Sequence, residues 1–126
     1  MKYEIIISNT TDLMRISALD IMGIKADGNY SSVILNDGES KIVLFQLGQL
    51  ENMINRQLGS DASMFIRIGR GLIINREYLY SINLSKQSLS VRTTNGCKCT
   101  FNASKESLKQ LKSYIETTIK KGSDNE

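Results

Sequence analysis

The chain has 126 residues, of which 40% are apolar and 23% are charged. This length and composition are typical of one globular domain with its own core, and they exclude an intrinsically disordered chain. The sequence contains no histidine and only two cysteines, which excludes histidine acid–base catalysis, a cysteine–histidine nucleophile pair and zinc sites with a histidine ligand. No segment has the apolar length of a signal peptide or of a membrane span, so we expect a cytoplasmic protein.

Charge is divided unevenly along the chain. Residues 1–61 contain five basic and eight acidic side chains, whereas residues 62–112 contain nine basic and two acidic ones, so the two segments carry net charges of −3 and +7. Such an asymmetry favours a polyanionic partner, and nucleic acid is the commonest one. A basic surface that serves only solubility is the alternative interpretation.

The first half of the chain predicts strands followed by one helix. Apolar and β-branched runs predict strands over residues 2–7, 20–25, 30–35 and 41–45. The last three are separated by Asp-Gly pairs at 27–28 and 37–38, which favour tight turns and therefore an antiparallel meander. An apolar stripe at helical spacing follows, made of Leu47, Leu50, Met53, Ile54 and Leu58. It predicts a helix of about three turns that ends at Gly59.

The second half predicts five more strands and a final helix. The strands are expected over residues 64–68, 70–75, 78–84, 88–92 and 97–101. We expect the first two to form one extended run with an interruption at its glycines, and Asn95-Gly96 to turn the last two into a hairpin. Ser104 is a candidate N-cap for a helix whose apolar stripe is Leu108, Leu111, Ile115 and Ile119. The prediction is a mostly β domain with short helices, one internal and one C-terminal, over residues 1–121, followed by a frayed polar tail at 122–126.

The sequence offers little for enzymatic chemistry. Its acidic residues lie mostly at turn positions, and Gly69-Arg70-Gly71 is too short for a phosphate-binding fingerprint. We therefore expect no enzyme, no cofactor, no metal and no small-molecule substrate. Cys97 and Cys99 are interpreted as two reduced thiols. A redox or metal-sensing role is the alternative for this pair, because Lys98 and Lys105 could lower a thiol pKa.

A nucleic-acid contact would have to come from strand ends and loops, because the chain has neither a helix-turn-helix unit nor paired aromatic strands of the RRM type. Three polar groups occupy such positions: Asn29, Tyr30, Ser31 and Ser32; Arg67 to Gly71; and Ser104 with Lys105. Tyr30 could equally be a cross-strand packing residue, and Asn75 is expected to cap the following turn. Arg67 and Arg70 should point to opposite faces of the extended run. We expect Arg67 to pair with a carboxylate, with DNA contact as its alternative, and Arg70 to contact DNA.

These groups occur within a longer pattern that resembles the LytTR DNA-binding domain of bacterial transcriptional regulators. The pattern runs from about Ile16 to Leu111 and comprises Asp20-Ile21-Met22, Gly28-Asn29-Tyr30-Ser31, a helix with Leu47 and Leu50, Phe65-x-Arg67-Ile68-x-Arg70-Gly71-x-Ile73-Ile74-Asn75-x-x-Tyr78-Leu79-x-Ser81-Ile82, and Ser104-Lys105. The block from Phe65 to Asn75 is its most specific part.

The resemblance implies an elongated β fold that binds duplex DNA through loops in successive major grooves, commonly at paired direct repeats in promoters. Its three contact loops fall on Asn29 to Ser32, on Arg70 and Gly71, and on Ser104 and Lys105. Two copies would sit on the repeats as a homodimer on DNA, and the chain is expected to act as a stand-alone regulator. Lys105 departs from the arginine usual in the family, and a lysine cannot make the forked contact to guanine. The alternative function is a basic protein-interaction module that docks on an acidic partner protein.

Overall fold

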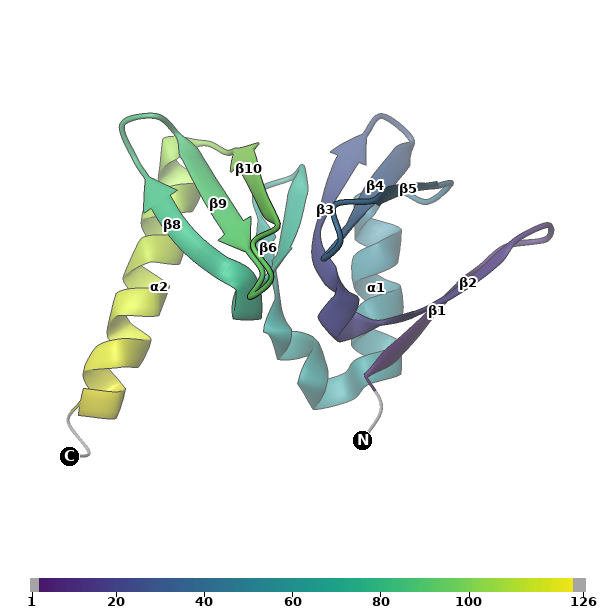
Figure 1. The fold of residues 1–126 in the computed structure, drawn as a ribbon, viewed down its shortest axis with the longest axis horizontal. Helices are drawn as coiled ribbons and strands as arrows, with labels where there is room; N and C mark the ends of the chain where they lie inside the picture. Colours follow the sequence, from purple (N-terminus) through teal and green to yellow (C-terminus); the bar gives the residue numbers. More distant parts are fainter. Residues whose placement is uncertain (1–2, 124–126) are drawn as a thin grey trace.

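The computed structural model describes residues 3–123, with side-chain surroundings described up to Thr118 (Figure 1). Within that range the elements in chain order are β1 (Glu4–Ser8), β2 (Leu13–Ser17), η1 (Ala18–Asp20), β3 (Ile21–Asp27), β4 (Tyr30–Leu35), β5 (Ser40–Val43), α1 (Leu47–Leu58), η2 (Gly59–Met64), β6 (Phe65–Ile68), β7 (Leu72–Asn75), η3 (Arg76–Tyr78), β8 (Leu79–Asn83), β9 (Ser88–Arg92), β10 (Lys98–Asn102) and α2 (Lys105–Ser123). The fold is mostly β, as the sequence predicts. No helix in the described part of the chain is long and apolar enough to span a bilayer.

The strands form three antiparallel sheets. A five-stranded sheet has the order β5-β4-β3-β7-β6, a three-stranded sheet has the order β10-β9-β8, and β1 pairs with β2 alone. The predicted meander is confirmed as β3, β4 and β5, with Gly28 and Gly38 at positive φ in its two turns. The predicted β9–β10 hairpin is also confirmed. Since β3 pairs with β7 as well as with β4, it lies at the centre of the largest sheet.

The central strands β3 and β7 of the five-stranded sheet have buried residues on both faces, since alternate residues of a strand point to opposite sides. Ile73 of β7 packs in a core cluster with α1, whereas Leu72 and Ile74 pack in a second cluster with the three-stranded sheet and α2. Figure 1 shows α1 and the β1–β2 hairpin on one side of this sheet, and the three-stranded sheet with α2 on the other. Gly23 allows the second layer to approach, since a Cβ there would lie 3.2 Å from the Phe101 ring.

Two features of the structure differ from the predictions. The strand β2 was not predicted: Met14 and Ile16 face the core, but the adjacent apolar residue Leu13 is 66% exposed and obscures the alternation. Residues 64–75 do not form one extended run, because Gly69 at φ +62° reverses the chain and β6 pairs with β7 as a hairpin. Helix α2 extends to Ser123, and residues 124–126 of the predicted polar tail lie outside the described residues. In its predicted stripe Leu108 and Leu111 are buried, and the side chain of Ile119 lies outside the described part.

Candidate nucleic-acid interface

Three chain reversals open toward one edge of the molecule. They are the β3–β4 turn, the β6–β7 turn and the connection from β10 to α2, all at the upper edge in Figure 1. These reversals carry the three predicted contact groups. The fold therefore brings three segments that are roughly 35 to 75 residues apart in sequence to a common edge, and local sequence patterns do not specify this arrangement.

The four residues of the first group have different surroundings. Asn29 is exposed, and its side-chain oxygen accepts a 3.2 Å hydrogen bond from the Gln46 amide at the start of α1. Tyr30 is 49% exposed, so its ring is not a core packing group. Ser31 is fully buried and its hydroxyl donates to the Phe45 carbonyl at 2.8 Å, whereas Ser32 is half-buried. The Ser31 side chain therefore holds β4 to the segment after β5, and it is not accessible to a ligand.

The second group is a tight turn held closed by Arg67. The Arg67 guanidinium donates to the carbonyl oxygens of Gly69 at 2.9 Å and of Arg70 at 3.1 Å, and it forms a 2.7 Å ion pair with Glu51 of α1. The predicted pairing of Arg67 with a carboxylate is thus confirmed, although Arg67 lies on β6 and Arg70 on the following turn, so the two arginines do not share one extended strand. The side chain of Arg70 is exposed and forms no ion pair with any residue in the described part of the chain.

The third group begins α2. Ser104 is the N-cap, as predicted, since its hydroxyl oxygen accepts a 3.1 Å hydrogen bond from the backbone N–H of Ser107. Lys105 follows as the first helical residue and is exposed. A cation at this position opposes the helix dipole, so an anionic ligand there would compensate for the unfavourable placement.

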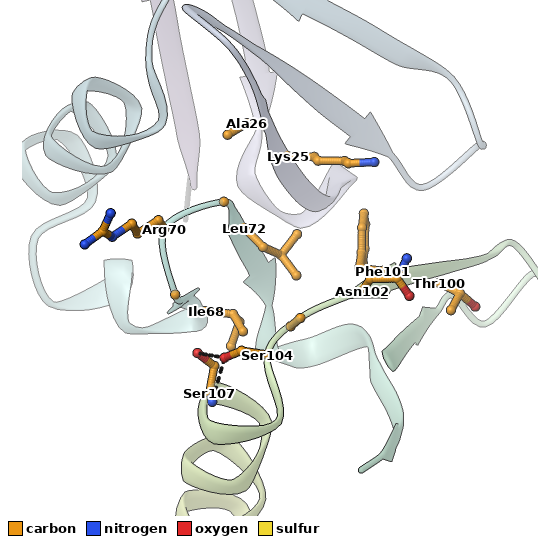
Figure 2. A pocket seen from close by; sticks show the side chains of 13 residues that line it. Lys25, Ala26, Ile68, Arg70, Leu72, Thr100, Phe101, Asn102, Ser104 and Ser107 are labelled. Carbon is orange, nitrogen blue, oxygen red and sulfur yellow. Dashed lines mark hydrogen bonds between the residues drawn. The ribbon is translucent and has the colours of Figure 1, made fainter. Parts of the chain in front are cut away.

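A groove of about 360 Å³ joins the second group to the third (Figure 2). Its lining residues are Lys25, Ala26, Ile68, Gly69, Arg70, Gly71, Leu72, Thr100, Phe101, Asn102, Ala103, Ser104 and Ser107. The buried side chains of Ile68, Leu72 and Phe101 make the groove partly apolar. The turn approaches α2 closely because Gly69 has no side chain: a Cβ there would lie 3.2 Å from the Ser107 hydroxyl. The turn and the helix start therefore form one continuous surface.

Lys25 and Asn102 line the groove and were not among the sequence candidates. Lys25 follows the buried Ile24 on β3, and Asn102 follows the buried Phe101 on β10. The alternation of buried and exposed residues in a strand predicts that both side chains are exposed. It does not predict that the ends of β3 and β10 meet, because these strands belong to different sheets.

The cysteine pair lies outside this groove. Cys97 and Cys99 are free and half-buried. Burial raises the pKa of the Cys99 thiol, and the positive charge of Lys25 only partly opposes that effect. Since a reactive or metal-binding cysteine needs a stabilised thiolate, this shift argues against the redox alternative at Cys99.

Comparisons with known proteins agree with this architecture. The family model described as the LytTr DNA-binding domain matches residues 11–116. A solved structure described as the LytTr DNA-binding domain of a methyl-accepting/DNA response regulator from Bacillus cereus is similar over 91% of this chain and 98% of its own, with a TM-score of 0.60 and 16% sequence identity. At this identity the likeness concerns the fold alone. A search of curated protein sequences gives no match.

Proposed function

The chain belongs to the LytTR family of DNA-binding domains, and from this premise we propose that it regulates transcription by binding direct repeats in promoter DNA through loops in the major groove. The observation that carries this proposal is the common edge formed by the three polar reversals (Figure 1). The excess of basic residues in 62–112 supports it further, because most of the affinity for duplex DNA comes from phosphate contacts.

The three groups would then make different kinds of contact. Arg70 presents a planar guanidinium from a closed turn, which suits a forked hydrogen bond to guanine in the major groove. Lys105 is a point charge at the start of α2 and suits a backbone phosphate. Asn29 and Tyr30 would contact a neighbouring groove from the β3–β4 turn, with Ser32 beside them. Gly71 would let the chain approach the DNA closely, and Ser104 would orient the helix that carries Lys105.

A salt series tests the proposal directly. The wild-type protein is titrated onto the duplex upstream of its own gene and onto an unrelated duplex at several salt concentrations. We expect the slope of log affinity against log salt to correspond to roughly four to eight phosphates, with tighter binding to the upstream duplex. A slope near zero on every duplex would refute DNA binding and favour the acidic-protein alternative.

The spacing of the repeats tests whether two copies bind as a homodimer on DNA. Copies that contact each other need both repeats on a defined face of the duplex, so an insertion of about 5 bp, half a helical turn, should abolish cooperative binding. Equal cooperativity with and without this insertion would contradict a protein contact between the copies.

A further inference from the structure

Lys25 lies outside the three contact groups, yet its side chain lines the groove between the second and third of them. The strand β3 is fixed at this point by β7, because Lys25 pairs with Leu72 and the N–H of Ala26 donates to the Gly71 carbonyl at 2.9 Å. The base of the Lys25 side chain is therefore held directly beside the turn that carries Arg70.

The charge of Lys25 is not neutralised within the fold. Lys25 is exposed, and the ion pairs among residues 3–118 use other cations. No carboxylate lines the groove, although Asp27 follows two residues later on β3. Figure 2 shows the Lys25 ammonium and the Asn102 amide on one side of the groove and the Arg70 guanidinium on the other. The groove thus has a cationic side chain on each side, with the Asn102 amide beside Lys25.

A duplex bound at this edge must pass a sugar–phosphate strand over the groove, because a loop that enters the major groove has a backbone strand on each side. We infer that Lys25 binds a phosphate of the strand that passes between Arg70 and Lys105, with the Asn102 amide as a second donor. This inference rests on the proposed function and adds a phosphate site to it.

The substitution Lys25→Gln removes the charge and keeps an exposed polar side chain. Loss of one phosphate contact should lower the salt slope by about one and weaken binding by about eightfold at 0.1 M salt, on the upstream duplex and on unrelated DNA alike. Lys25→Arg keeps the charge and should retain the wild-type slope. A retained slope in Lys25→Arg would show that the effect of Lys25→Gln comes from charge and not from a disturbed strand.

Lys41→Gln is the matched control. Lys41 is also an exposed lysine of the five-stranded sheet, but it lies on β5 and pairs with Glu39 at 3.3 Å. Its substitution should leave the salt slope unchanged. Thermal unfolding of each variant verifies that the domain is folded.

A scan with single methylphosphonates identifies the phosphate. Neutralising the contacted phosphate should weaken the wild-type protein by about eightfold and leave Lys25→Gln unaffected. If the wild type binds DNA but no phosphate behaves in this way, or if Lys25→Gln keeps the wild-type slope, the Lys25 site is overturned while the proposed function stands. If the wild type binds no duplex, both fail.

Discussion

Replacing Arg67 by alanine tests which of two roles this residue has: holding the β6–β7 turn closed or contacting DNA itself. The substitution removes the hydrogen bonds to the carbonyls of Gly69 and Arg70 and the ion pair with Glu51. The turn would then be held by the β6–β7 ladder and by the hydrogen bond from the Ala26 N–H to the Gly71 carbonyl. We expect lower stability together with weaker specific binding, because Arg70 would no longer be presented in one orientation.

The expected loss of stability in Arg67→Ala depends on how exposed Arg67 and Glu51 are. Arg67 and Glu51 have side chains 30% and 39% exposed, so their contacts fall between buried hydrogen bonds to charged groups, worth about 1.5–3 kcal/mol, and surface ion pairs, worth about 0–1 kcal/mol. A total loss of about 2 kcal/mol is expected, which corresponds to a fall in Tm of roughly 6–10 °C for a domain of this size. Specific affinity should fall by about tenfold, on the order of 1.4 kcal/mol.

Thermal unfolding and a salt series on the same variant measure both effects. The salt slope should stay at its wild-type value, because the Arg67 guanidinium is already engaged by Glu51 and the two turn carbonyls. Arg67→Lys keeps a cation near Glu51 but cannot donate to both turn carbonyls, so its stability should fall between those of the wild type and Arg67→Ala. An unchanged Tm together with a slope lower by about one would refute the reasoning and make Arg67 a DNA contact.

Three further predictions concern single sites. Arg70→Ala should lose about 1–3 kcal/mol of binding free energy on the specific duplex and less on random DNA, whereas Lys105→Ala should weaken binding to both duplexes evenly and lower the salt slope by about one. The Tm should be unchanged in each variant. Titrations on both duplexes check this, and equal effects of the two substitutions would contradict it. Cys97→Ser with Cys99→Ser should leave DNA affinity within about twofold under reducing conditions, since neither thiol is assigned a ligand; a loss of binding in the shift assay would show otherwise. Asn75→Ala should lower the free energy of unfolding in urea by about 2–4 kcal/mol, because the buried side chain donates to the carbonyls of Ala18 and Ile21 and accepts from the N–H of Glu77. A loss below about 1 kcal/mol would contradict that role.

The local elements were predictable because each depends on neighbouring residues. The Asp-Gly pairs specify the turns of the meander, and the apolar stripe from Leu47 to Leu58 specifies α1 up to Gly59. The cap at Ser104 and the side-chain turn at Asn75 also follow from side chains that bond to backbone a few residues away. The order of polar motifs was sufficient to identify the family.

Contacts between distant segments were decided only by the tertiary structure. Whether residues 64–75 extend or reverse depends on the pairing of β6 with β7, and the burial of Ser31 depends on Phe45 lying beside it. The groove places residue 25 near residues 70 and 104 because β3 pairs with β7 and Phe101 packs against Gly23. Hydrophobic periodicity indicates which face of a strand is buried. It does not indicate which other element covers that face, because the hydrophobic effect is non-directional. The sequence by itself therefore determined most of the elements and the candidate loops, and packing between the layers determined which side chains meet at the edge formed by the three reversals.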